Sequence, residues 1–192
     1  MVSDNYKGYL PANAKKVFKG EIFEVWQWEQ EMFDGSKEVV ECVYRSGTVF
    51  ILATVGDKIL LQKEEHPGRG SFISLPGGRA DFPGENLLDA AKRELLEETG
   101  YTSDDWELWI ERQLHRKILW PLHVYFARNC VYKQPPVLAA GERIEPYFAT
   151  FDQFLELAEN PDFRVEELRL PMLRAKLDPK EKERLYNLIF KK

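Results

Sequence analysis

Glu94, Glu97 and Glu98 stand three and four residues apart in a stretch whose apolar residues recur at helical spacing. At that spacing the three carboxylates occupy neighbouring positions on one helical face, where they repel one another. This repulsion is relieved if a positive charge lies against the face. Carboxylate oxygens suit hard divalent cations, and Mg²⁺ in particular is held by a few carboxylates, water and substrate phosphates. The cluster therefore predicts metal-assisted chemistry on a phosphate compound.

The helix that must carry these carboxylates has recognisable ends. Asn86 is a suitable N-cap, and Gly100 stands where a left-handed residue ends many helices. We therefore predict a helix over residues 87–99. Arg93 lies next to the glutamates, where a guanidinium can fix a carboxylate through two parallel hydrogen bonds.

A longer motif surrounds this helix. It consists of Gly78, Glu85, the run Arg93-Glu94-Leu95, the pair Glu97-Glu98 and the pair Gly100-Tyr101. These residues resemble the Nudix box, the signature of the Nudix hydrolases, and every position matches from Glu85 onward. Six residues separate Gly78 from Glu85, one more than the family pattern has. The extra residue could shift Glu85 or the carbonyl groups of the glycine turn.

The resemblance implies a metal site built on this box. Glu94 and Glu98 are expected to be the main ligands of Mg²⁺, for which Mn²⁺ is a substitute. Glu97 is expected to be a third ligand or to orient a water molecule bound to the metal. The carbonyl oxygen of Gly77 is a further candidate ligand, because a glycine turn lets the backbone approach a cation closely.

The resemblance also implies catalytic residues. Arg93 is expected to hold the glutamates, and Glu85 to hydrogen-bond Arg93 or to contact the metal through water. For the general base, the loop after the core strands offers Glu142 and Glu145. We favour Glu142, which follows a glycine. Other members of the family take the base from the box, so Glu97 is the alternative.

The expected reaction is attack of water on one phosphorus of a nucleoside diphosphate linked to a further group. The chain resembles the ADP-ribose pyrophosphatase branch, which favours an ADP-sugar such as ADP-ribose, giving AMP and ribose 5-phosphate. Lys63-Glu64-Glu65 stands where that branch tends to carry Gln-x-Arg, and Ser74 stands where it often carries glutamate. A GDP-sugar, a dinucleotide and a nucleoside triphosphate therefore stay open as substrates, as does a non-catalytic ADP-ribose-binding sensor.

Two kinds of side chain are candidates for substrate binding. Trp26 or Trp28 could stack a nucleobase, although packing in the core or at a dimer interface is the alternative for both. The arginines that could meet phosphate groups are Arg69, Arg79, Arg112 and Arg116.

Composition places the chain among ordinary globular proteins. It has 192 residues, of which 44% are hydrophobic and 31% charged, and a net charge of −5, which argues against a nucleic-acid-binding surface. It contains no apolar run as long as a membrane span and no apolar core of a signal peptide near its N-terminus. Cys42 and Cys130 lack metal-ligand spacing and are expected to be free buried thiols. We predict a cytoplasmic protein with neither a nucleic-acid nor a membrane partner.

The N-terminal quarter predicts an antiparallel β-hairpin. Two runs rich in aromatic and β-branched residues, 17–33 and 37–45, flank the turn signal Asp34-Gly35. The first run is apolar on both faces, so the main domain or a second subunit should cover it twice. The resemblance implies that this hairpin helps to form a homodimer.

After the hairpin come predicted strands, the acidic helix, more strands and helices near 152–160 and 179–190. The resemblance implies an α/β fold, an α/β/α sandwich around a mixed sheet. We divide the chain into an arm and hairpin at 1–45, a Nudix hydrolase domain at 46–160 and a C-terminal helical tail at 161–192.

Overall fold

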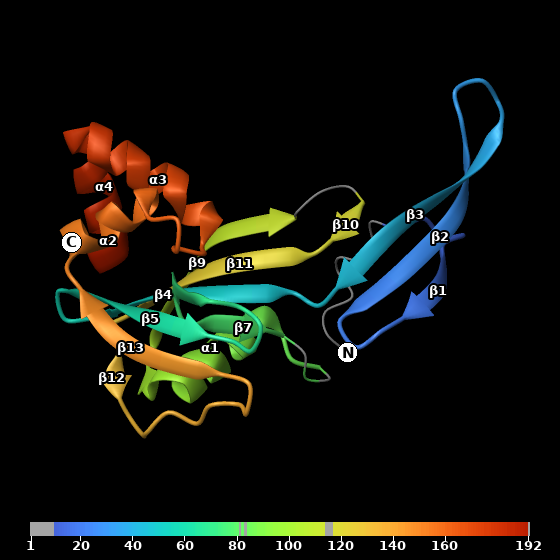
Figure 1. The fold of residues 1–192 in the computed structure, drawn as a ribbon. Helices are drawn as coiled ribbons and strands as arrows, with labels where there is room; N and C mark the ends of the chain where they lie inside the picture. The colour runs from blue at the N-terminus through green and yellow to red at the C-terminus, as the bar shows by residue number, and fades with distance from the viewer. Residues whose placement is uncertain (1–9, 81, 83, 114–116, 192) are drawn as a thin grey trace.

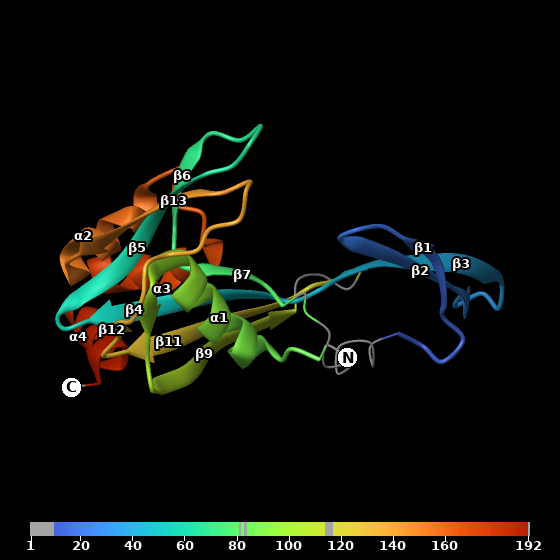
Figure 2. The ribbon, with the colours of Figure 1, turned by 90° about the horizontal axis from the view of Figure 1, so that it is seen from below.

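The computed structural model describes residues 10–80, 82, 84–113 and 117–191 (Figure 1). Arg116, one of the candidate phosphate-binding residues, lies outside these ranges. The described chain forms a layered core and a second, smaller sheet that projects from one end of it (Figure 2). Among the described residues no helix is both long and apolar enough to cross a membrane.

The core is built on a mixed sheet of seven strands. The strands β13, β5, β4, β11 and β9 follow one another across it, while β6 pairs with β5 and β7 with β4. β4 and β11 run parallel to each other, and the remaining pairs are antiparallel. The strands span Thr48–Val55 (β4), Lys58–Glu65 (β5), Ser71–Ser74 (β6), Gly77–Arg79 (β7), Asp105–Gln113 (β9), Pro121–Arg128 (β11) and Arg143–Ala149 (β13). Two short strands, β8 (Tyr101–Thr102) and β12 (Val131–Tyr132), pair separately.

One helix, α1, covers one face of this sheet. It spans Leu87–Thr99, as predicted. The side chain of Asn86 accepts a hydrogen bond from the backbone N–H of Asp89, and Gly100 adopts a left-handed φ of 76°. The buried residues of α1 pack with those of β4, β5 and β11 in one apolar cluster. The acidic helix is therefore fixed to the sheet by its apolar face.

The other face of the sheet is covered by C-terminal helices, which completes the predicted α/β/α sandwich. They are α2 (Phe151–Glu156) with a 3₁₀ turn after it (Leu157–Glu159), α3 (Glu166–Leu177) and α4 (Pro179–Phe190). Their buried residues share one core with the sheet. The helix predicted near 152–160 corresponds to α2 and this turn, and it begins after Thr150, which is the N-cap and forms a capping box with Gln153. α3 was not predicted, because Pro171 interrupts its sequence and its first turn has no side-chain cap.

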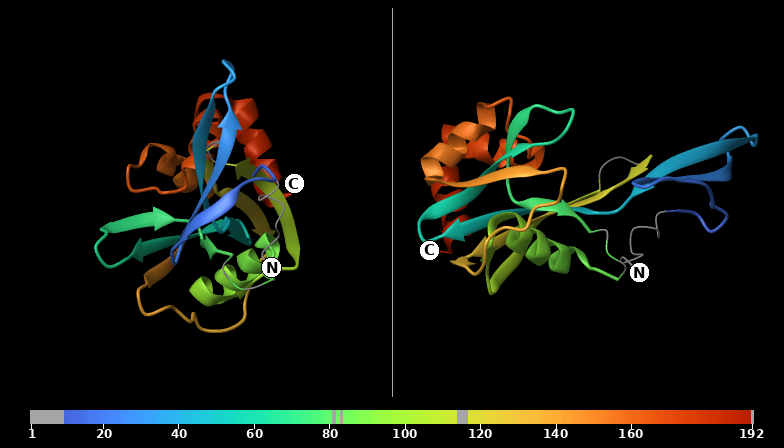
Figure 3. Two further views of the ribbon diagram at one scale, coloured as in Figure 1. Left: turned by 90° about the vertical axis from the view of Figure 1, so that its right-hand side faces the viewer. Right: turned by 60° about the horizontal axis from the view of Figure 1, so that its bottom comes forward.

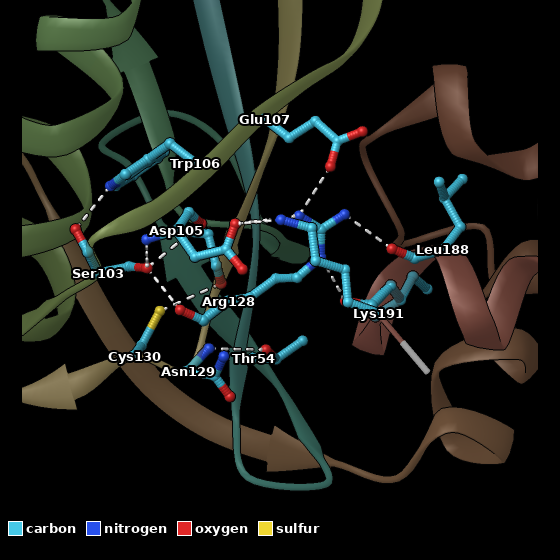
Figure 4. Close-up of polar contacts among 12 residues, drawn as sticks. Thr54, Ser103, Asp105, Trp106, Glu107, Arg128, Asn129, Cys130, Leu188 and Lys191 are labelled. Carbon is cyan, nitrogen blue, oxygen red and sulfur yellow. Dashed lines mark hydrogen bonds and ion pairs between the residues drawn. The ribbon is translucent and has the colours of Figure 1, made fainter.

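A buried arginine fastens α4 to the sheet (Figure 4). Arg128, the last residue of β11, is only 2% exposed. Its Nε and Nη2 atoms donate to the carbonyl oxygens of Ile189 and Leu188 at 3.0 and 2.8 Å, near the end of the helix. Glu107 at 2.9 Å and Asp105 at 3.5 Å balance its charge. The arginine thus satisfies carbonyl groups that a helix end leaves without partners.

The projecting sheet contains the predicted hairpin. Its order is β1-β2-β3-β10, with β1 at Lys15–Lys19, β2 at Phe23–Glu31, β3 at Lys37–Arg45 and β10 at Ile118–Leu119. β2 and β3 are antiparallel, and Gly35 in their turn has a φ of 82°. The first predicted run is two strands rather than one, with a break after Lys19. Phe18 and Val39 are 57% and 70% exposed, so the core domain does not cover this sheet, and cover by a second subunit stays a prediction.

Candidate functional site

The acidic face of α1 lies against the glycine strand β7. The backbone N–H of Gly77 donates to Oε2 of Glu98 at 2.8 Å. A Cβ atom at Gly78 would collide with the carboxylate of Glu94. Any side chain at this point would move the Glu94 carboxylate, so glycine lets that carboxylate lie directly against the strand. The glycine part of the motif, in β7, thus contacts its acidic part, in α1, through the strand backbone and the glutamate carboxylates.

Arg93 is the centre of the hydrogen-bond network in this site. Its Nε and Nη2 atoms donate to the two oxygens of Glu85 at 2.7 and 3.1 Å. Nη1 donates to Glu94 at 2.9 Å and to Glu97 at 3.1 Å. Nη2 also donates to the carbonyl oxygen of Arg79 in β7 at 2.9 Å. One guanidinium therefore orients three carboxylates and ties the helix to the strand.

The additional residue upstream of Glu85 does not separate Glu85 from the helix. The side chain of Glu85 reaches Arg93 in the two-pronged geometry given above. Phe82, in the same loop, lies with its ring 4.6 Å from the guanidinium carbon. The extra length is thus taken up in the loop, and of the two expected roles for Glu85 the structure favours the contact with Arg93.

Burial and charge shape the acidity of Glu94. Burial raises the pKa of this carboxyl group to about 7, although the charge and hydrogen bonds of Arg93 pull the pKa downward. The charges of Glu97 and Glu142 raise it further. The pKa of Arg93 is itself raised: burial opposes this, but the hydrogen bond with Glu85 and the charge of Glu94 outweigh it. Around Glu94, the carboxylates therefore carry more negative charge than Arg93 can neutralise.

Glu98 is more deeply buried, with 5% of its surface exposed. Burial raises the pKa of its carboxyl group well above the usual value, and the charges of Glu94 and Glu64 add to the effect. Hydrogen bonds from Gly77 and from the side chain of Gln62 act in the opposite direction. A cation at this position would offset the remaining cost of the buried charge.

Sequence analysis missed two of these neighbours, Gln62 and Glu64 on β5. Nε2 of Gln62 donates to Glu98 at 2.8 Å and to Glu64 at 3.3 Å. Leu60, Gln62 and Glu64 alternate along the strand and therefore share one face. Leu60 belongs to the apolar cluster beneath α1. The sequence thus contained a signal for these two site residues: Gln62 and Glu64 are polar, yet they stand at alternate positions after Leu60, on the buried face of the strand.

The donor atoms in the site fit a hard divalent cation. The predicted ligands Glu94, Glu97, Glu98 and Gly77 offer oxygen only, which suits Mg²⁺ and disfavours softer metals. Within the described ranges, no three His, Cys, Asp or Glu side chains already form a group that could hold an ion. Glu94 is bonded to Arg93 and Glu98 to Gly77, so these carboxylates have to adjust when an ion binds.

The loop after β12, residues 133–142, brings one of the two candidate bases to the site. The backbone N–H of Val137 donates to the carbonyl oxygen of Glu97 at 2.7 Å, which ties the loop to α1. Glu142 is half-buried, and its charge raises the pKa of Glu94. Glu145 is exposed on β13. The geometry therefore favours Glu142 over Glu145 as the residue near the carboxylates.

The candidate tryptophans lie on the projecting sheet. Nε1 of Trp26 donates to Glu24 at 3.0 Å, and Nε1 of Trp28 donates to Gln30 at 3.3 Å. Both residues belong to β2, which extends away from the core and from α1 (Figure 2, and Figure 3, right). Within one chain the structure does not bring them to the carboxylates.

The candidate arginines are scattered. Arg79 is half-buried in β7, where its carbonyl oxygen accepts from Arg93. Arg69 is exposed in the turn between β5 and β6, and Arg112 is exposed on β9. Of these three arginines, Arg79 is the one whose backbone takes part in the site.

Comparison with known proteins identifies a family. Residues 44–174 match the model of the NUDIX domain. The ADP compounds hydrolase NudE of Escherichia coli K12 is 28% identical over 159 residues, which cover 79% of this chain and 82% of that protein. The ADP-ribose pyrophosphatase of Bacillus subtilis 168 is 31% identical over 91 residues, covering 46% of this chain and 49% of that protein. The crystal structure of an ADP compounds hydrolase matches the fold with a TM-score of 0.69 at 22% identity, covering 88% of this chain and 94% of that one.

Proposed function

This chain belongs to the Nudix family and is an enzyme that hydrolyses pyrophosphate bonds, and we propose that its substrate is an ADP-sugar such as ADP-ribose, cleaved to AMP and ribose 5-phosphate. The names of the relatives, an ADP compounds hydrolase and an ADP-ribose pyrophosphatase, support an ADP derivative. The observation that supports a metal-dependent hydrolase is the network in which Arg93 fixes Glu85, Glu94 and Glu97 while Gly77 fixes Glu98.

The proposed cofactor is Mg²⁺, with Mn²⁺ as a substitute, because Nudix hydrolases generally use divalent metals and the donors are oxygens. Glu94 and Glu98 would hold the ion, with Glu97 and the carbonyl oxygen of Gly77 as further ligands. A divalent cation supplies neutralisation of the pyrophosphate charge and activation of water.

The protein's own residues perform the remaining steps. Arg93 keeps the carboxylates in one orientation, so that they need little rearrangement during the reaction. We propose that Glu142 accepts the proton of the attacking water, since it lies on the loop beside α1 and its charge acts on Glu94. Arg79 and Arg69 are proposed to bind the phosphates.

The remaining parts of the proposal concern assembly and location. We propose a homodimer formed through the projecting sheet, in which Trp26 or Trp28 stacks the base of the substrate. Cys42 and Cys130 are buried and unpaired, which is typical of proteins in a reducing compartment and supports a cytoplasmic location.

Product analysis with purified protein and Mg²⁺ tests the substrate. The panel contains ADP-ribose, other ADP- and GDP-sugars, dinucleotides and nucleoside triphosphates. We expect AMP and ribose 5-phosphate from ADP-ribose with kcat/KM of about 10⁴ M⁻¹s⁻¹ or above. Turnover of a different member alone would replace the substrate and keep the mechanism. Tight binding of ADP-ribose with no turnover of any member would contradict the hydrolase assignment and indicate a sensor.

A further inference from the structure

β5 carries two buried polar side chains beneath the acidic helix. Gln62 is fully buried and Glu64 is 8% exposed. Both lie on the face of β5 toward α1, in the row that Leu60 begins. A polar side chain in such a row is costly unless its hydrogen-bonding groups find partners. The hydrogen-bond partners of Gln62 and Glu64 therefore indicate why polar side chains occupy these buried positions.

Gln62 bridges two carboxylates and leaves one atom unsatisfied. Its Nε2 donates to Glu98 and to Glu64. Its Oε1 is buried and, within the part of the chain that the structure describes, has no hydrogen-bond partner. Buried acceptors without a donor are rare, because they bear the full cost of lost hydration. The amide oxygen thus indicates that a hydrogen-bond donor or a cation is missing beside Gln62.

The charge around Gln62 independently requires compensation. The carboxylates of Glu64 and Glu98 both accept from the same amide nitrogen, Nε2 of Gln62, at 3.3 and 2.8 Å, so they lie close to each other. Among the described ion pairs, Glu64 contacts His66 at 3.3 Å, and neither carboxylate pairs with a lysine or arginine. Two buried carboxylates without such a partner are unfavourable. A divalent cation would supply the missing positive charge.

We propose that Glu64 is a further carboxylate of the divalent-cation site, held beside Glu98 by Gln62, so that the ion is shared between α1 and β5. This inference rests on the proposed function, because it assumes an ion on the acidic face of α1. Ser74 and His66 also hydrogen-bond Glu64 and orient its carboxylate. A ligand on a central strand adds rigidity that a helix alone does not give the site.

Metal binding by two matched variants tests the proposal. Glu64→Gln removes one charge while keeping the shape of the side chain, and Glu65→Gln makes the same change at the next position, which is exposed and pairs only weakly with Arg143 at 3.5 Å. Titration calorimetry with MnCl₂ on the chelator-treated full chain gives the affinity. We expect Glu64→Gln to weaken Mn²⁺ binding by about tenfold or more, and Glu65→Gln to bind as the wild type does.

Thermal unfolding separates this role from a structural one. In EDTA, Glu64→Gln should melt at or above the wild-type temperature, because a buried repulsion is gone, while Mg²⁺ should raise its melting temperature less than that of the wild type. Equal loss of stability with and without Mg²⁺, or an unchanged Mn²⁺ affinity, would overturn the proposal. Suppose that Glu64→Gln weakens Mn²⁺ binding as expected but the wild-type protein hydrolyses none of the substrates in the panel. That result would support the cation site and refute only the hydrolase assignment.

Discussion

At the scale of single residues, different groups hold the carboxylates of the site: Arg93 orients some of them, while neutral groups hold Glu98. Arg93 donates to three carboxylates and one carbonyl group and so fixes their geometry. Glu98 has no contact with Arg93 among the described interactions and is held instead by Gly77 and Gln62. The most buried carboxylate of the box is therefore also the one whose charge is least compensated by the protein, which is the property expected of a cation ligand.

We predict that Glu98→Gln keeps the fold and lowers kcat by about 10²-fold or more, because an amide preserves the contacts with Gly77 and Gln62 but removes the charge. The measurement is steady-state turnover of the panel substrate, with circular dichroism to establish folding. Lys92→Gln, on an exposed position of the same helix, is the control and should behave as the wild type. Near-normal turnover of Glu98→Gln would remove Glu98 from the metal site.

At the scale of elements, two connections place groups that the motif does not contain. The loop 133–142 is bonded to α1 through the carbonyl oxygen of Glu97 and to the C-cap of α1 through that of Gly100, and it thereby positions Glu142. β11 ends in Arg128, which bonds the end of α4. Both connections can be tested by substitutions that leave the box unchanged.

The loop prediction compares Glu142→Gln with Glu145→Gln. If Glu142 is the base, its substitution lowers kcat by about 10²-fold or more, whereas Glu145→Gln, on the exposed strand position, has little effect. Unchanged rates in both variants would move the role of the base to Glu97.

The helix prediction concerns stability. Arg128→Met should lower the free energy of unfolding by about 3 kcal/mol, because two helix carbonyl groups and Glu107 lose a buried donor. Urea unfolding measures this change, and activity at low temperature should persist because the network lies apart from the box. Lys191→Ala is the control: its pair with Asp105 at 2.7 Å is half-exposed and should contribute about 1 kcal/mol or less. Equal stability of Arg128→Met and wild type would show that apolar packing alone holds α4.

At the scale of the whole molecule, the projecting sheet is a part where apolar side chains are left exposed. Its exposed apolar side chains include Val17, Phe18, Phe23 and Val39, and its tryptophans lie away from the carboxylates of the same chain. Several exposed apolar side chains on one small sheet are typical of an interface. A second copy covering this sheet would account for both features.

We therefore predict a dimer in solution, with twice the 22.5 kDa mass of the chain in light scattering after gel filtration. The double variant Phe18→Asp, Val39→Asp should shift the protein toward the monomer mass, because it places charge on exposed apolar positions of the sheet. Lys37→Gln, which removes an exposed ion pair with Glu29 on the same hairpin, should leave the dimer intact. A wild-type protein of monomer mass would refute the assembly.

Much of the local architecture followed from the sequence alone. The ends of α1, the two-pronged contact available to Arg93 and the turn at Gly35 depend on residues a few positions apart, where capping, helical spacing and backbone freedom act directly. The family resemblance extended this to the sandwich fold and the enzyme class. These features are local or carried by a fixed spacing, so they could be predicted before any packing was known.

Tertiary structure decided which distant residues join the site. Gln62 on β5 bonds both Glu64 and Glu98 because strand register and helix packing bring β5 against α1, and no local rule links positions so far apart. The same packing chose Glu142 over Glu145 as neighbour of the carboxylates and formed α3 despite Pro171. Burial outweighs local propensity when a segment can complete a core. The sequence therefore determined the reactive motif and its helix, and the packing of sheet, loop and helices determined its surroundings.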